Sequence, residues 1–387
     1  MLSVPAVTVP FVSEPVGNSI LLLGSFFLLL LGAEIFTNGV EWFGHRLGVS
    51  ESATGSILAA VGTALPETMI PVIAILQQTT GGGTAADEVG VGAILGAPFM
   101  LATIAMFMVG ASVLYFSERR RFGAEMHFNA VSTRRDLSFF LLGYSLAFLT
   151  ALIHNRLIDY AVAASLVLLY VIYLHRSLVS GQLIEHEGLD DLHLGLIVEE
   201  ALERLPGPYP TKRHRANPTT LLVGLQTLLA LSLIIGGAHL FVEEVQWAAT
   251  DVLGIPAAVV ALLLAPLATE LPEKFNSVLW ISRDKDTLAL GNITGAMAFQ
   301  GTLPVTLGIV FTSWNLSLEW GTTGFLNGFS AILAVVSGAI LYLRARSVDE
   351  GNMLPRPFLV GGLFYLLFII ILVYHVLTFD LAVGAHG

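Results

Sequence analysis

The sequence predicts an all-α membrane protein with ten transmembrane helices, arranged as two inverted five-helix repeats. Three observations support this fold class: an apolar composition, repeated apolar segments of membrane-spanning length, and a motif that occurs once in each half. The 387 residues are 55% hydrophobic and only 12% charged, whereas soluble domains average about 25% charged residues. The mean hydropathy is +0.78. This composition excludes an ordinary soluble enzyme.

Ten apolar segments are long enough to cross a bilayer, which takes about 20 helical residues. We expect the spans at residues 18–42, 50–77, 88–115, 136–153, 157–177, 218–245, 255–282, 286–312, 325–343 and 357–379. One long polar segment separates spans five and six. It divides the chain into a first repeat (1–178), a cytoplasmic linker (179–217) and a second repeat (218–387).

The linker contains an acidic stretch with interleaved histidines. These residues are Glu185, His186, Glu187, Asp190, Asp191 and His193. They could form a regulatory metal site, but a solvated linker with a short amphipathic helix is the favoured interpretation.

The basic residues predict the orientation of the spans. Sixteen of the 18 Lys and Arg residues follow odd-numbered spans, Arg156 lies on the other side and Lys274 lies within a span. Since cytoplasmic loops carry the excess of Lys and Arg, the odd-numbered exits should face the cytoplasm. Both termini should therefore lie outside.

A group of short segments occurs twice in the same order. The corresponding segments are 47–49 and 253–255, 63–67 and 269–273, and 92–96 and 291–295. Span two enters the bilayer from the cytoplasm and span seven from outside, so the two copies should be inverted. Inverted repeats are typical of secondary transporters, in which the repeated segments locate the substrate site.

Each copy places a glutamate directly after a proline near the middle of a span. Proline lacks a backbone donor and displaces the carbonyl four residues earlier, here that of Gly62 or Ala268. The hydroxyl of Thr63 or Thr269 follows directly. Each copy thus offers carboxylate, carbonyl and hydroxyl oxygens, which hard cations such as Ca²⁺ and Na⁺ prefer.

A charge in the middle of a span costs roughly 2.5–3.5 kcal/mol on insertion scales, so intramembrane carboxylates indicate function. We expect Glu67 and Glu273, which the repeat duplicates, to hold a cation. Glu270 has two interpretations, because it precedes Lys274 by four residues, a favourable spacing for an ion pair. It could pair with Lys274 or bind a cation, and the spacing alone does not decide.

Four glycines in the companion segments, Gly92, Gly96, Gly291 and Gly295, are spaced in pairs four residues apart. Small residues at this spacing let helices approach closely. They could serve packing alone, or they could bring spans three and eight against the site.

These motifs resemble the α-repeats of the sodium/calcium exchanger family, within the cation:calcium antiporter superfamily and of the prokaryotic type. Residues 62–67 (Gly-Thr-Ala-Leu-Pro-Glu) differ by one residue from the family signature Gly-Thr-Ser-Leu-Pro-Glu. Residues 268–273 occupy the position of this signature in the second repeat. The likeness covers nearly the whole chain. It implies that the two motif glutamates hold calcium, helped by the backbone carbonyls of Thr63 and Thr269.

The companion motif of that family, Gly-Asn-x-x-Gly-Ser-Asn followed by an acid or amide, matches only in part. Apolar residues stand at most of its polar positions, namely Ala97, Pro98, Leu101, Ala296 and Met297. Gln300 stands where the second copy often has Asp, and we hypothesise that Glu270 replaces this acid. If Lys274 neutralises Glu270, two net negative charges remain, which predicts fewer than three monovalent ions per Ca²⁺.

The expected function is secondary active exchange of Ca²⁺ for Na⁺ by alternating access. Exchange of Ca²⁺ or another divalent cation for H⁺ is the alternative. The expected cation ligands are Glu67, Glu273, Thr63, Thr269, Glu270, Gln300, Gly62 and Ala268. The cations are substrates, and no cofactor is expected.

Other classes of function lack their motifs. The sequence has no HExxH helix, no phosphate-binding loop and no recognisable Ser–His arrangement, so an enzyme or an ATP-driven pump is not expected. A passive channel would conduct without a counter-ion. We expect a multi-pass protein of the cell membrane, with the cations and the lipid bilayer as partners, no nucleic acid, and a monomer sufficient for transport.

Overall fold

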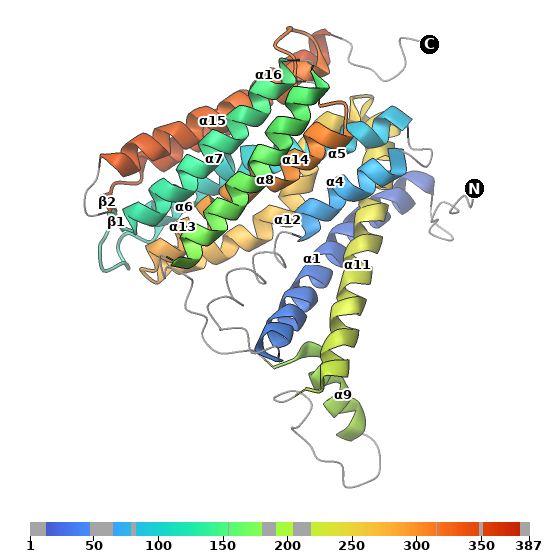
Figure 1. The fold of residues 1–387 in the computed structure, drawn as a ribbon, viewed down its shortest axis with the longest axis vertical. Helices are drawn as coiled ribbons and strands as arrows, with labels where there is room; N and C mark the ends of the chain where they lie inside the picture. The colour runs from blue at the N-terminus through green and yellow to red at the C-terminus, as the bar shows by residue number, and fades with distance from the viewer. Residues whose placement is uncertain are drawn as a thin grey trace. The chain divides into compact units, whose positions relative to one another are not determined.

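A computed structural model describes residues 13–46, 65–78, 83–153, 155–179, 191–203, 218–314, 316–347 and 351–379 (Figure 1). These ranges are almost entirely helical and contain one short two-stranded sheet. Within them, seven helical stretches are long and apolar enough to cross a membrane. The fold class is therefore that of a multi-pass α-helical membrane protein.

The membrane-length stretches are α1 (Glu14–Arg46), α5 (Gly83–Met100) with the π-helical η3 (Leu101–Ala105) and α6 (Met106–Tyr115), α8 (Arg156–Val179), α11 (Thr220–Trp247) with the π-helical η4 (Ala248–Leu253), α13 (Asp286–Gln300) with α14 (Leu303–Phe311), α15 (Thr323–Arg346) and α16 (Arg356–Thr378). The other elements are α4 (Leu65–Gln77), β1 (Met126–His127), α7 (Ala130–Ala151), α9 (His193–Glu203), α12 (Ala257–Ser282) and β2 (Asn352–Met353).

Three of the ten expected spans, 50–77, 136–153 and 255–282, are not among the seven. Helices α4, α7 and α12 lie there, but residues 50–64 are outside the described ranges. The other two helices carry several charges: Arg134, Arg135 and Asp136 in α7, and Glu270, Glu273 and Lys274 in α12. The count of ten spans therefore stays a prediction.

Helix α7 begins at Ala130, six residues before the expected start of span four. The reason is a helix cap, because Asn129 Oδ1 accepts hydrogen bonds from the backbone N–H groups of Val131 and Ser132, both at 3.0 Å. Asparagine is among the preferred capping residues. Arg134 and Arg135 consequently lie in a helix and not in a loop.

The chain forms two compact units, each of which takes segments from both halves of the sequence. Unit 1 comprises residues 1–69 and 174–244, and unit 2 comprises residues 70–173 and 245–387. The predicted boundaries at residues 178 and 217 divide the chain by its sequence repeats, whereas the two units are defined by contacts in the structure. The division into repeats therefore stays a prediction.

Unit 1 is built on the packing of α1 against α11. A Cβ atom at Gly32 would lie 2.8 Å from Ile234, and one at Gly237 would lie 3.1 Å from Leu29, both closer than an ordinary contact, so the two glycines allow close approach of the helices. The expected short helix in the linker is confirmed as α9.

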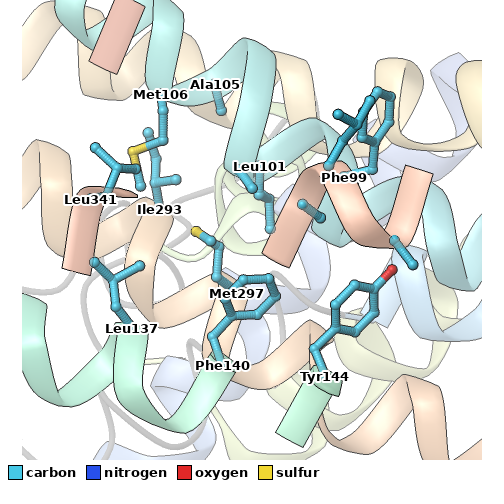
Figure 2. Close-up of a cluster of buried hydrophobic side chains, with 14 of the residues drawn as sticks. Phe99, Leu101, Ala105, Met106, Leu137, Phe140, Tyr144, Ile293, Met297 and Leu341 are labelled. Carbon is cyan, nitrogen blue, oxygen red and sulfur yellow. The ribbon is translucent and has the colours of Figure 1, made fainter. Parts of the chain in front are cut away.

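Unit 2 has a continuous apolar core formed by α5, η3, α6, α7, α13 and α15, with contributions from α12, α14 and α16. Figure 2 shows part of it, where Leu101 lies near Met297 of α13 and Phe140 of α7, and Phe99 of α5 belongs to the same cluster. All four side chains are at most 1% exposed. The core thus reaches the companion motifs of both repeats.

Helices α5 and α12 pack closely in unit 2. A Cβ atom at Gly92 or Gly96 would overlap the carbonyl oxygen of Ala258 or Leu262, respectively. Close approach is therefore confirmed for the first glycine pair. Among the described residues, none comes within 4 Å of the position that a Cβ atom on Gly291 would take, and only the Tyr173 hydroxyl does so at Gly295. The role of the second pair stays a prediction.

Two reciprocal contacts link the stretch α5–α6 to the stretch α13–α14. Asp87, near the start of α5, accepts hydrogen bonds from the backbone N–H (3.2 Å) and hydroxyl (2.5 Å) of Ser313, which follows α14. Asp286, at the start of α13, accepts one from the backbone N–H of His127 (2.8 Å), which follows α6. The start of each stretch thus meets the segment after the other, so α5–α6 and α13–α14 run antiparallel.

The segments after spans three, seven and nine meet on one face of unit 2. Strand β1 follows span three and pairs antiparallel with β2, which follows span nine. Arg120, also after span three, forms a buried ion pair with Asp286 at 2.5 Å. On the opposite face, the indole N–H of Trp314 donates a hydrogen bond to the Ala147 carbonyl (3.0 Å). This grouping agrees with the sidedness that the basic residues predict.

Candidate cation-binding site

The second repeat motif lies in the middle of α12, which stays helical from Ala257 through Pro272 to Ser282. The Thr269 hydroxyl is buried and donates a hydrogen bond to the Ala265 carbonyl at 3.0 Å. The side chains of Ala268 and Glu273 lie outside the described ones. The ligand roles of Thr269, Ala268 and Glu273 therefore stay predictions.

Glu270 is the centre of a buried polar group on α12 and α13. Its Oε2 lies 3.2 Å from Lys274 Nζ, and these two side chains are 3% and 1% exposed. Its Oε1 accepts a hydrogen bond from Gln300 Nε2 at 3.1 Å. Of the two interpretations of Glu270, the ion pair with Lys274 is confirmed.

The Gln300 contact bears on the hypothesis that Glu270 replaces an acid in α13. The amide of Gln300 donates to the carboxylate, whereas an aspartate in its place would bring two negative charges together. A neutral amide at this position of α13 is therefore compatible with a carboxylate that α12 supplies. Gln300 is 2% exposed, so the contact is shielded from solvent.

The first copy of the motif is described only from Leu65 onward. Gly62 and Thr63 lie outside the described residues, and Glu67 is in the first turn of α4 with 7% exposure. A carboxylate in the first turn is stabilised by the helix dipole. Glu67 belongs to unit 1 and Glu270 to unit 2, so a shared site for the two stays a prediction.

The apolar departures from the companion motif belong to the core. Leu101 and Met297 are both fully buried in the apolar cluster of Figure 2, and Ala97 is 3% exposed. Pro98 lies inside α5 just before η3. Leu101 and Met297 therefore serve packing and offer no side-chain oxygen to a cation.

Two polar contacts of the second companion motif were missed by the sequence prediction. Thr294 donates a hydrogen bond to the buried carboxylate of Asp136 at 2.8 Å, and Asn292 donates one to Ser277 at 3.3 Å. Asp136 also pairs with its neighbour Arg135 at 3.0 Å. The signal that could have found Asp136 was an acid next to arginines at the edge of an apolar segment.

Among the described side chains, no three His, Asp or Glu residues come together closely enough to hold a metal ion. His193, which the linker prediction singled out, is described, whereas the acidic residues 185–190 are not.

A model of the sodium/calcium exchanger protein family matches residues 18–179 and 222–377, which is most of the chain. The chain belongs to this family. The match spans both predicted repeats and leaves out the linker, and it confirms the family resemblance of the motifs.

Individual members of the cation:calcium antiporter superfamily are distant. This exchanger-family chain is 24% identical over 353 residues to CaxA of Alkalimonas amylolytica, an antiporter by name, covering 90% of this chain and 98% of CaxA. The crystal structure of the H⁺/Ca²⁺ exchanger CAX has a TM-score of 0.61 at 16% identity and covers 94% of this chain and 89% of CAX.

Two further solved structures have similar folds. Native YfkE has a TM-score of 0.58 at 11% identity, covering 94% of this chain and 92% of YfkE. The sodium-calcium exchanger NCX_Mj, soaked with 2.5 mM Na⁺ and 10 mM Sr²⁺, has a TM-score of 0.50 at 19% identity, covering 91% and 98%. At sequence identities this low, the structural similarity establishes a shared fold. Membership of the family supports cation antiport involving Ca²⁺, and thus a transporter.

Proposed function

We propose that this exchanger-family protein exchanges Ca²⁺ for Na⁺ across the cell membrane by alternating access. The observation that supports this proposal best is the buried carboxylate of Glu270 at the repeated Pro-Glu motif, held by Lys274 and Gln300. An intramembrane carboxylate with such partners is typical of an ion pathway. Glu67 and Glu273 supply the remaining charge of the site.

The proposed ligands come from both repeat motifs. In the first repeat they are Gly62, Thr63 and Glu67, and in the second Ala268, Thr269, Glu270, Glu273 and Gln300. Carboxylate, carbonyl and hydroxyl oxygens make up this set, as Ca²⁺ requires. The ions are substrates, and the transport unit is a monomer without a cofactor.

The proposed architecture is ten spans in two inverted five-helix repeats, with both termini outside. The reciprocal contacts of Asp87 and Asp286 support inversion, because the two acids occupy equivalent positions. Each precedes the first glycine of its companion motif by five residues. Their partners lie on opposite faces of unit 2, as an inverted pair of segments requires.

Proton-coupled exchange is the second candidate. The observation that favours it is the loss of sodium-type side-chain oxygens, since Leu101 and Met297 are buried in the apolar core. A site that keeps its carboxylates but has lost several neutral side-chain oxygens is suited to protonation. Sodium-driven flux would then be absent.

The test is Ca²⁺ uptake into proteoliposomes under an imposed Na⁺ gradient and, separately, under an imposed H⁺ gradient. We expect uptake with the Na⁺ gradient and a loss of at least tenfold in Glu67→Gln, since the variant removes a ligand charge worth more than about 1.4 kcal/mol. Ser232→Ala, which alters an exposed hydroxyl on α11, is the control and should transport normally. Uptake under the H⁺ gradient alone would establish the second candidate, and uptake under neither would overturn the proposed function.

A further inference from the structure

We infer that Asp136 is a positioning residue of the transport site, which holds α13 at the rotation and depth that bring the amide of Gln300 to Glu270. This inference rests on the proposed function. Asp136 lies on α7 and is 3% exposed. Its Oδ2 accepts a hydrogen bond from the hydroxyl of Thr294 on α13 at 2.8 Å. All four residues belong to unit 2.

The carboxylate of Asp136 joins three helices. Its Oδ1 lies 3.1 Å from Arg135 Nε and 3.0 Å from Arg135 Nη2. The hydroxyl of Tyr173 on α8 donates a further hydrogen bond to the carboxylate. The same hydroxyl would lie 3.5 Å from a Cβ atom on Gly295, the second glycine of the companion motif. Helices α7 and α8 therefore meet α13 at this carboxylate.

Helix α13 is held on two faces. Thr294 and Asn292 are two residues apart, which places them about 200° apart around a helix of 3.6 residues per turn. Asn292 donates a hydrogen bond to a serine hydroxyl of α12 at 3.3 Å. Gln300 also faces α12, where its amide donates to Glu270 Oε1 at 3.1 Å. The bond to α7 thus secures the face of α13 that lies away from the Glu270 group.

Apolar packing alone would leave the rotation of α13 loosely defined. Phe140 of α7 and Met297 of α13 belong to one apolar cluster (Figure 2), and hydrophobic attraction has no preferred direction. A hydrogen bond is directional and weakens steeply when its angle falls below about 120°. The desolvation cost of a buried carboxylate also offsets much of the attraction of its partners. The main contribution of Asp136 is therefore orientation and not attraction.

Orientation matters at Gln300, which is the last residue of α13. It lies six residues beyond Thr294, or about 9 Å along the helix axis, so a turn of the helix at Thr294 moves the amide sideways. Binding sites need their groups held within roughly 0.5 Å. A misplaced amide would leave Glu270 without its donor from α13, and the carboxylate would be less well placed for Ca²⁺.

The test is a double-mutant cycle on Ca²⁺ affinity, measured by isothermal titration calorimetry on the purified full chain in detergent. Thr294→Val keeps the shape and removes the hydroxyl, so the dissociation constant for Ca²⁺ should rise at least about threefold. Thr294→Ser keeps the hydroxyl and should bind as the wild type does. Gln300→Ala should weaken binding by itself. Adding Thr294→Val to Gln300→Ala should then change the constant by no more than about twofold.

Thr150→Val is the matched control. Thr150 is another buried threonine of unit 2, and its hydroxyl donates to the Leu146 carbonyl of its own helix α7 at 2.8 Å. This variant should leave the affinity unchanged. If Thr294→Val does not fold, Asp136→Asn takes its place in the cycle, because a neutral amide is a weaker acceptor and should weaken Ca²⁺ binding in the same way.

Two results would overturn the inference: an unchanged affinity in both Thr294→Val and Asp136→Asn, or an equal loss from Thr294→Val with and without Gln300→Ala. In the second case Asp136 would serve stability alone. A wild-type chain that binds Ca²⁺ but moves none under either gradient would overturn the proposed function, while the cycle would still decide the inference. A wild-type chain that binds no Ca²⁺ would overturn both.

Discussion

At Gly96, the missing side chain determines how closely α5 approaches α12. The backbone of Leu262 occupies the space that a Cβ atom would need, and backbone cannot move aside as a flexible side chain can. The same holds for Gly92 and Ala258. Since α12 carries Glu270 and Lys274, these two glycines also determine where the carboxylate group lies within unit 2.

We expect Gly96→Ala to destabilise the protein by roughly 1–3 kcal/mol, the usual range for overpacking a filled interior. Thermal unfolding of the purified protein in detergent measures the effect as a lower melting temperature. Gly236→Ala is the matched control, because Gly236 lies in α11 and no atom of the described residues comes within 4 Å of its Cβ position. An unchanged melting temperature in Gly96→Ala would show that α5 and α12 can separate freely.

At the scale of an element, the linker helix α9 is attached to unit 1 through its first turn. The backbone N–H of His193 donates to Asn38 Oδ1 (3.2 Å), and that of Leu194 donates to Gln226 Oε1 (2.7 Å). Asn38 belongs to α1 and Gln226 to α11, and the two amides are bonded to each other at 2.8 Å. The first N–H groups of a helix have no partner within it, so this amide pair serves as their cap.

We expect Asn38→Leu and Gln226→Leu to speed amide hydrogen exchange in the peptide of residues 191–197. Each variant removes one acceptor, and a hydrogen bond worth about 1–1.5 kcal/mol corresponds to roughly tenfold faster exchange. Hydrogen exchange with mass spectrometry measures this directly. Ser232→Ala, elsewhere on α11, should leave the peptide unchanged, and equal rates in all variants would mean that α9 is held by other contacts.

For the whole molecule, the sidedness of the loops can be tested cleanly because the chain contains no cysteine. Arg119 follows span three on the face that we assign to the cytoplasm, and Glu319 follows span eight on the opposite face. Both residues are exposed. Single cysteines at these positions therefore report on opposite sides of the bilayer.

We expect a membrane-impermeant maleimide to label Glu319→Cys in intact cells and Arg119→Cys only after permeabilisation, because the arginine-rich face should be cytoplasmic. Labelling both positions after permeabilisation controls for reactivity. The reverse pattern would invert the whole topology while leaving the fold unchanged.

The local features of the site could be predicted from the sequence, whereas its long-range contacts could not. Glu270 and Lys274 meet because four residues make one helical turn. Asp136 and Thr294 are 158 residues apart, and no pattern within either segment indicates the other. The cap at Asn129 was missed for a different reason: the neighbouring arginines suggested a loop, although the capped helix already includes them.

The bond between Asp87 and Ser313 has a consequence for biosynthesis. Its partners are separated by 226 residues, and a ribosome adding 5–20 residues per second needs roughly 10–45 s to make that length. During this interval Asp87 has entered the membrane without its native donor. The glycine face of α5 is likewise without α12. The early half of the protein must therefore remain in the bilayer as an incomplete assembly, which is the stage at which an insertion chaperone or a quality-control protease would recognise it.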